Sequence, residues 1–407
     1  MKHKAGRFWP NITQTLSRRL WPLDSLSLQE RARRRTGLDD FGDPPVDPPL
    51  TILTESLQHE AGLHSPGRFL MHGHLSEILE IRLRLAAAWR NENPGGLMPI
   101  EKPVFITGMP RSGSTFLHEL LSQDHENRSP KVWEVMFPLP APGPRRDMRV
   151  YRAGMRLWLF RRLARRADEV YPVRAETPHE CVAIHSFTLQ SEEFVTTCRV
   201  PSYEHYLRRT GLRSAYAWQK RFLQHLQSRL PAKRWVLKSP DHLYGLEELF
   251  SVFPDAVVIQ THRDPIDVLS SSLQLTETLH NLFAIPEPPN HAQEREARIL
   301  AATMDRSIRF RDQHPELAGR FLDVNYAELV SDPLATASRI YEHMKAPLSP
   351  QAAEKMRSLV AMRSKYQRRR NPTLADLGLD VAAEVRRFQN YCRRFDVPMT
   401  HARHRPG

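Results

Sequence analysis

The chain of 407 residues is long enough for one large α/β domain with appendages or for two or three average domains. Its net charge of +13 favours a polyanionic partner, which leaves nucleic acid, an anionic membrane surface and a multiply charged small molecule as classes. The three cysteines are odd in number and far apart, so they argue against a disulfide framework or a cysteine metal knuckle and fit a reducing cytoplasm.

Helical patterns dominate residues 1–100, which we expect to form an extension. "SLSLQERARRRTG" predicts a helix that starts at a serine cap and stops at Gly37, and "HLSEILEIRLRLAAAWR" places leucines at helical spacing over 74–90. The N-terminus is basic but lacks the unbroken apolar region of a signal peptide, and no run of about 18 apolar residues occurs. We therefore expect a cytoplasmic protein without a membrane span.

A glycine loop follows the first predicted strand. "VFITG" ends at Gly108, and "STFLHELLSQD" continues with a helical face from Ser114. The intervening "GMPRSGST" has the glycine spacing of a nucleotide-binding P-loop, but Ser114 stands where that motif has lysine. Arg111 restores a cation, one that can form two parallel hydrogen bonds with an anion. Consecutive N–H groups at the start of a helix then favour a phosphate-like ligand, and a tight turn without a ligand is the alternative.

The stretch from about 130 to 230 is mostly helical in pattern, and we expect it to form an insertion around the acceptor. Its most basic part, "RRDMRVYRAGMRLWLFRRLARR" (145–166), carries an apolar stripe. This pattern is compatible with a helix on an anionic membrane surface. The simpler interpretation, which we favour, is a solvated helix that packs on the core through Met155, Leu159 and Leu163.

Three further runs predict buried strands, each followed by a helical pattern: "RWVLKS" (234–239), "AVVIQTHR" (256–263) and "RFLDVNY" (320–326). Alternating strands and helices predict an α/β fold, with a P-loop-like three-layer α/β/α core and a central parallel sheet over 101–345. Such sheets bind ligands outside the carboxyl ends of their strands. Residues 346–407 are expected to form a helical tail packed on this core.

The strand ends lack the acid that a nucleotide kinase needs to hold magnesium. One predicted strand ends near Lys238, and the next runs into His262 and Arg263. Cations thus stand where carboxylates are expected. This favours a donor whose group is transferred without the help of a metal. A nucleotide-dependent kinase with a degenerate P-loop stays open as an alternative enzyme. A basic, non-catalytic protein on an anion or a membrane surface stays open as an alternative binding protein.

Together these residues resemble the cytosolic sulfotransferases that use 3′-phosphoadenosine 5′-phosphosulfate, in particular the bacterial branch with a longer helical N-terminus. "PRSGSTF" is similar to the 5′-phosphosulfate loop of that family. The resemblance implies that the loop holds the 5′-phosphosulfate and that Phe116 lies against the adenine. The loop residues concerned are Arg111, Ser112, Gly113, Ser114 and Thr115.

Three other stretches carry the resemblance further. "HRDPIDVLSSS" is similar to the second signature of the family, which implies that Arg263 and Ser271 hold the 3′-phosphate. This separation is sensible, because Arg263 ends a strand and Ser271 lies about two turns into the next helix. "VLKSPDHL" resembles the stretch with the catalytic lysine, so Lys238 would neutralise the charge that develops on the bridging oxygen. "VNYAEL" implies that Tyr326 lies near the adenine.

The position of the general base departs from the pattern of the small-molecule branch of this family. The small-molecule branch has a histidine two residues after the lysine, where this chain has Pro240. Other branches use a glutamate, and Glu134 in "KVWEVMF" is our first candidate, followed by a second group: Glu180, His179 and His242. In the tail, "SKYQRRRNPT" offers Arg368 to Arg370 as contacts of the 3′-phosphate, although a charge run is usually a solvated face.

The sequence thus predicts a sulfotransferase that moves a sulfonate group to a hydroxyl or amine by in-line transfer without a metal. We expect a small-molecule, lipid or carbohydrate as acceptor. The sequence leaves the acceptor's identity and the oligomeric state open. No recognition helix or aromatic-interleaved strand supports a nucleic-acid partner.

Overall fold

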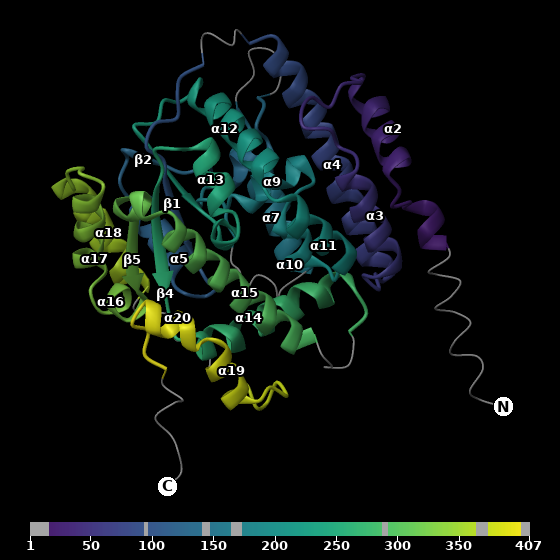
Figure 1. Cartoon of the computed structure of the whole chain (residues 1–407). Helices are drawn as coiled ribbons and strands as arrows, with labels where there is room; N and C mark the ends of the chain where they lie inside the picture. Colours follow the sequence, from purple (N-terminus) through teal and green to yellow (C-terminus); the bar gives the residue numbers. More distant parts are fainter. Residues whose placement is uncertain are drawn as a thin grey trace.

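The structure is a computed structural model that describes residues 16–92, 97–140, 147–163, 173–286, 292–363 and 373–399. Within these ranges the chain forms one five-stranded parallel sheet in the order β2-β3-β1-β4-β5, with helices on both sides (Figure 1). The predicted fold class, a three-layer α/β/α core with a central parallel sheet, is therefore confirmed. The strands are β1 (Val104–Gly108), β2 (Asn127–Arg128), β3 (Arg234–Lys238), β4 (Val257–His262) and β5 (Phe321–Asn325).

Strand β1 occupies the centre of the sheet, and all five of its residues are buried. It pairs with β3 on one side and with β4 on the other. Because every pair is parallel, the carboxyl ends of these strands meet at one edge of the sheet. Gly108, Lys238 and His262 end the three strands, so the motifs that follow them lie at the same edge.

The side chains of β1 alternate between two layers of helices. Val104 and Ile106 pack in one apolar cluster with Leu117 of α5 (Ser114–Leu121). Phe105 packs in the opposite cluster with Tyr216 of α12 (Arg213–Gln227). The first layer also contains α16 (Tyr326–Ser331), α17 (Pro333–His343) and α18 (Pro350–Arg363), and the second also contains α13 (Leu246–Val252).

The N-terminal region is helical, as predicted, and shares the second apolar cluster with the sheet. Its helices, α2 (Ser25–Thr36), α3 (Pro49–His59) and α4 (Ser65–Arg90), lie on the side of the sheet opposite α17 and α18 (Figure 1). Helix α2 is capped by Asp24, whose carboxylate accepts from the N–H of Ser27 at 2.9 Å, and not by a serine. Helix α4 begins nine residues before the predicted start, because the His64 side chain caps it.

Arg82 of α4 ties this helical region to the rest of the molecule. Its guanidinium is fully buried and donates to the carbonyl oxygens of Phe41 at 2.9 Å, Phe187 at 2.8 Å and Gly42 at 3.0 Å. The same group stacks on Trp218. Burial lowers the pKa of Arg82 to about 10, so the side chain stays charged at neutral pH and depends on these acceptors.

The remaining helices fall into two groups along the chain. Those between the first and third strands are α6 (Val132–Met136), α7 (Arg149–Leu163), α9 (Val182–His185), α10 (Glu192–Thr197) and α11 (Pro201–Thr210), with a 3-10 turn at Ser186–Thr188. Those after β3 are α14 (Pro265–Phe283), α15 (Ala292–Gln313), α19 (Val381–Arg387) and α20 (Gln389–Arg394), with 3-10 turns at Pro240–Leu243 and Pro315–Arg320. Within the described ranges, no helix combines the length and apolar character needed to cross a bilayer. Arg368 to Arg370 lie outside the described residues.

Replacing Arg82 by methionine keeps most of the side-chain length but removes the donor that the carbonyl groups of four residues share: Phe41, Gly42, Pro44 and Phe187. Because each unpaired buried carbonyl costs about 1–3 kcal/mol, we expect the free energy of unfolding to fall by about 3 kcal/mol. Chemical denaturation followed by tryptophan fluorescence measures this change. Arg84→Met, at an exposed position of the same helix, is the control and should shift the same free energy by less than about 0.5 kcal/mol. Equal stability of the two variants would contradict the role given to Arg82.

Candidate active site

The loop between β1 and α5 turns at two glycines where a side chain would not fit. Gly108 has a φ of 146°, and a Cβ there would lie 2.2 Å from Oγ1 of Thr261. Gly113 has a φ of 95°, and a Cβ there would lie 2.9 Å from Cδ2 of Tyr326. Arg111, between them, also has a positive φ of 65°. The loop is thus pressed against β4 and Tyr326, which fixes where α5 begins.

Helix α5 starts with N–H groups that no side chain caps in the described part of the chain. Its N-cap is Gly113, and Ser114 and Thr115 form its first turn and line a cavity. The first N–H groups of a helix have no intrahelical acceptor and carry the positive end of the helix dipole. Ser112 differs: its hydroxyl donates to the carbonyl oxygen of Met109 at 2.6 Å and is buried, so this side chain braces the loop.

Arg111 and Arg263 lie 152 positions apart in the chain and meet at the edge of the sheet. Nη1 of Arg263 donates to the carbonyl oxygen of Arg111 at 3.0 Å, and Nε of Arg111 donates to Oγ of Ser271 at 3.1 Å. The Arg263 guanidinium also stacks on Tyr326, 4.3 Å from the ring centroid. The structure thus brings residues of both predicted anion-binding motifs into one cluster.

Acids balance the charges in this cluster only in part. Among the described residues no carboxylate pairs with Arg111, whereas Arg263 has Asp267 at 3.5 Å. Burial and the neighbouring Arg263 lower the pKa of Arg111. A lowered pKa means that the fold disfavours this second cation, and a bound anion would remove the penalty. The cluster is therefore suited to a phosphate or sulfate group, which arginine binds with two hydrogen bonds.

Lys238 ends β3, and its ammonium group links two sides of the cavity. Nζ donates to Oγ1 of Thr115 at 3.0 Å and to Oε1 of Glu180 at 2.6 Å. The lysine side chain is buried, so its ion pair with Glu180 is shielded from water. Lys238 pairs with Ile106 in the sheet, which sets it one strand away from the glycine loop.

Glu180 and His179 stand in a loop that backbone hydrogen bonds hold beside β3. The N–H of Cys181 donates to the carbonyl oxygen of Lys238 at 2.9 Å, and the N–H of His179 donates to that of Pro130 at 2.8 Å. Both candidate bases line the cavity, with Glu180 pointing toward Lys238. Burial lowers the pKa of His179, so its imidazole is held neutral.

Glu134, our first candidate for the general base, lies elsewhere. Its Oε2 accepts from the N–H of Lys131 at 2.9 Å, and its Oε1 pairs with Arg128 at 2.8 Å. Its carboxylate caps α6, and it is not among the residues that line the cavity, so this placement does not support it as the base. His242 is also set back from the cavity: it is fully buried against the hydroxyl of Tyr216 at 2.8 Å, and burial lowers its pKa to about 3.

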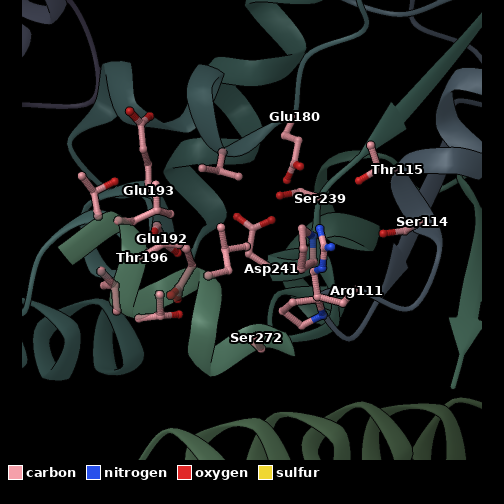
Figure 2. A pocket seen from close by; sticks show the side chains of 18 of the residues that line it. Arg111, Ser114, Thr115, Glu180, Glu192, Glu193, Thr196, Ser239, Asp241 and Ser272 are labelled. Carbon is pink, nitrogen blue, oxygen red and sulfur yellow. Dashed lines mark hydrogen bonds between the residues drawn. The ribbon is translucent and has the colours of Figure 1, made fainter. Parts of the chain in front are cut away.

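A cavity of about 1450 Å³ joins the glycine loop to the helical insertion. Phe116 and Tyr326 add aromatic surface at the loop end. Figure 2 shows the two ends of the cavity and the side chains between them. The loop end has Arg111, Ser114 and Thr115, the far end has Glu192, Glu193 and Thr196, and Glu180, Ser239 and Asp241 lie between.

The far end, bordered by α10, α14 and α15, combines apolar walls with paired carboxylates. Its apolar lining includes Val182, Val195, Leu273, Leu279 and Ile299. Glu192 pairs with Arg208, and Glu193 pairs with His74 at 2.8 Å. Burial raises the pKa of the Glu192 carboxyl to about 7. Glu277 and Glu296 also line the cavity, so this end places several acids beside an apolar surface.

Sequence reasoning missed the residues of this far end. Glu192 and Glu193 follow Ser191, whose hydroxyl accepts from the N–H of Glu193 at 3.1 Å. Serine followed by acids is the pattern of an ordinary helix start, and it carries no signal that the acids face a cavity. The contact between Thr115 and Lys238 was equally out of reach, because only strand pairing brings the two residues together.

The fold and the site define an α/β protein with an edge built to hold an anionic group beside a buried lysine. The model of the sulfotransferase family matches residues 103–350, and the chain belongs to this family. The family predicted from the loop and the second cationic motif is therefore confirmed.

Two solved structures share the fold over most of the chain. Sulfotransferase STF1 from Mycobacterium tuberculosis is 28% identical with a TM-score of 0.75, and the match covers 91% of this chain and 100% of that one. Sulfotransferase STF9 from Mycobacterium avium is 26% identical with a TM-score of 0.80, and the match covers 93% of this chain and 98% of that one.

A curated relative matches a shorter part of the chain. It is the omega-hydroxy-beta-dihydromenaquinone-9 sulfotransferase Stf3 of Mycobacterium bovis, 26% identical over 259 residues. The match covers 60% of this chain and 63% of the relative, which is less than two thirds of the relative's length.

Gly113→Ala tests whether the loop depends on the close approach to Tyr326. The new methyl group meets that ring in a backbone conformation that alanine disfavours, so we expect the free energy of unfolding to fall by about 2 kcal/mol. Urea denaturation measures the change. Gly319→Ala is the matched control, because a Cβ there meets nothing within 4 Å, and it should stay within about 0.5 kcal/mol of the parent. A Gly113 variant as stable as this control would show that the loop accommodates a side chain at this position.

Proposed function

We propose that this protein is an enzyme that transfers a sulfonate group from 3′-phosphoadenosine 5′-phosphosulfate to the hydroxyl group of an apolar acceptor. The observation that carries the proposal is the meeting of Arg111, Arg263 and Ser271 at the edge of the sheet that also holds Lys238. Membership of the sulfotransferase family supports the reaction class. Two arguments support 3′-phosphoadenosine 5′-phosphosulfate as the donor: members of this family generally use it, and it fits the site as described next.

The donor carries an anionic group at each end, and the site offers two places for such groups. The uncapped start of α5, with Thr115 and Lys238, suits the 5′-phosphosulfate. Arg263 and Ser271 suit the 3′-phosphate, and Arg111 contacts both of these residues. Phe116 and Tyr326, which line the same end of the cavity, supply aromatic faces for the adenine and its ribose.

The chemistry needs in-line attack and control of charge. The acceptor oxygen attacks the sulfur, the bond between sulfur and the bridging oxygen breaks, and adenosine 3′,5′-bisphosphate leaves with the bonding electrons. Lys238 neutralises the charge that develops on the bridging oxygen. Because the transition state of such transfers is loose, positioning by the loop and by Arg111 contributes most of the rate acceleration.

Glu180 is the residue that we propose as the general base. Its carboxylate lies 2.6 Å from Nζ of Lys238, so an acceptor hydroxyl that reaches Glu180 is also next to the leaving oxygen. The proton passes from the acceptor oxygen to Glu180 as the new bond to sulfur forms. His179 precedes Glu180 in the chain and also lines the cavity, so it can help to orient the acceptor.

The acceptor is proposed to be an apolar alcohol of lipid size. The far end of the cavity has apolar walls beside several acids, among them Glu192, which pairs with Arg208, and Glu193, which pairs with His74. These acids would repel an anionic acceptor, whereas they would not repel a neutral chain with a terminal hydroxyl. The relative Stf3 is named for an omega-hydroxy menaquinone, which is an acceptor of the same kind.

Donor binding is tested by calorimetry with adenosine 3′,5′-bisphosphate and with adenosine 5′-monophosphate. Arg263→Gln removes a charge-assisted contact to the 3′-phosphate, so we expect the affinity for the bisphosphate to fall about 30-fold, while the monophosphate binds as before. Arg298→Gln, at an exposed position of α15, is the control and should leave both affinities unchanged. Loss of affinity for both nucleotides to the same degree would remove Arg263 from the 3′-phosphate site.

The base is tested by comparing Glu180→Gln with Glu134→Gln. The first substitution removes the proton acceptor, so kcat with an omega-hydroxy menaquinone analogue should fall at least about 100-fold with donor affinity almost unchanged. The second changes a helix cap outside the cavity and should leave kcat within about threefold of the parent in protein that is still folded. The opposite pattern would return the role of base to Glu134.

A further inference from the structure

Helix α7 (Arg149–Leu163) has a composition unlike that of the other helices around the site. It contains five arginines and no acidic residue, and the rest of its sequence is mostly large and apolar. A helix of this kind is expected to bury its apolar side chains and leave the arginines in water. The structure shows a different arrangement.

The apolar side chains of α7 point away from the protein. Tyr151 is 61% exposed, Trp158 is 50% exposed and Leu159 is 53% exposed, and Met155 between them is 47% exposed. These residues are spaced as one stripe along a helix. The packing predicted from the sequence, through Met155 and Leu159, is therefore wrong, and the side chain of Leu163 lies outside the described residues.

The inner face of α7 is narrow and polar, so the outward direction of the stripe is fixed. Ala153 is fully buried there, and four residues before it Arg149 donates to the carbonyl oxygens of Phe137 and Pro138, both at 3.3 Å. Arg156 forms an ion pair with Glu77 of α4. Turning the apolar stripe inward would break these contacts.

An apolar stripe of this size is unusual on a surface. Isolated exposed apolar residues are common, but a contiguous group rimmed by charge marks a surface that meets another phase or another molecule. Each of these side chains gains about 1.5–3 kcal/mol when it is fully buried, so even partial burial of the stripe is a substantial driving force.

We propose that this stripe, formed by Tyr151, Met155, Trp158 and Leu159, docks on the surface of an anionic lipid bilayer. The helix would lie in the plane of the interface with the stripe among the acyl chains and exposed arginines such as Arg152 at the phosphate groups. Each arginine near an anionic bilayer adds about 1 kcal/mol of attraction. The proposal stands on this surface alone and does not depend on the proposed reaction.

Charge decides between a bilayer and a second copy of the chain. A symmetric dimer through this face would set the arginines of one α7 against those of the other, at a repulsive cost. The chain as a whole carries a charge of +13, which also favours an anionic surface over itself.

Helix α7 lies close to the far end of the cavity, where we propose that the acceptor binds. On α4, Glu77 pairs with Arg156 of α7, and one helical turn earlier His74 pairs with Glu193 at the far end of the cavity. Helix α7 is thus anchored to α4 one helical turn away from the residue that contacts the far end of the cavity. A lipid-dissolved acceptor would have a short path from the bilayer to that end of the cavity.

Co-sedimentation of the full chain with vesicles tests the proposal. Vesicles of phosphatidylcholine with about a third phosphatidylglycerol should bind the protein, vesicles of phosphatidylcholine alone should bind at least about tenfold less, and raising salt from about 0.1 to 0.5 M should weaken binding. Trp158→Ser combined with Leu159→Ser should lower the affinity for anionic vesicles at least about tenfold.

The control variant removes apolar groups elsewhere that are more exposed than Trp158 and Leu159. Leu26 is 73% exposed and Met362 is 66% exposed, so Leu26→Ser combined with Met362→Ser should bind anionic vesicles like the parent. Calorimetry with adenosine 3′,5′-bisphosphate should give the parent affinity for both double variants, which separates a failure at this face from a failure of the donor site. Equal loss in the two variants, or equal binding to neutral and anionic vesicles, would overturn the proposal. So would sedimentation equilibrium showing a dimer that only the Trp158 and Leu159 variant loses.

Discussion

The contact between Arg111 and Arg263 is the constraint on which the site depends. The guanidinium group of Arg263 donates to the backbone carbonyl oxygen of Arg111, and Arg111 has no acidic partner among the described residues. Such an arrangement is stable only because the loop is fixed by its glycines and because Ser271 and Tyr326 supply other contacts. The fold thereby holds cationic charge in place before any ligand arrives, which is the preorganisation that anion transfer requires.

The parallel sheet explains how the two halves of the cavity come to serve one reaction. The loop after β1 and the helix after β4 form the cationic end, while α10, α14 and α15 border the end with apolar walls and paired acids. Lys238, at the end of β3, stands between them with Thr115 on one side and Glu180 on the other. In the reaction that we propose, an anionic donor and an apolar acceptor meet at this lysine.

The sequence predicted most of the core and part of the site. Four strands and the helical N-terminal region followed from the hydrophobic pattern. That the two arginine motifs serve one ligand was implied by the family resemblance, and parallel strands bring their ends to one edge. The sequence did not show that Glu134 lies outside the cavity, where its carboxylate accepts from the N–H of Lys131 and pairs with Arg128. The stripe of α7 was turned inward because periodicity gives the spacing of an apolar face but not its direction, which Arg149 and Ala153 decide.

A crystal structure of the protein with adenosine 3′,5′-bisphosphate tests the central claim most directly. The account predicts the 5′-phosphate at the first turn of α5 within hydrogen-bond distance of Lys238, and the 3′-phosphate against Arg263 and Ser271. A nucleotide bound outside this cavity, or bound with its two phosphates exchanged, would contradict the account.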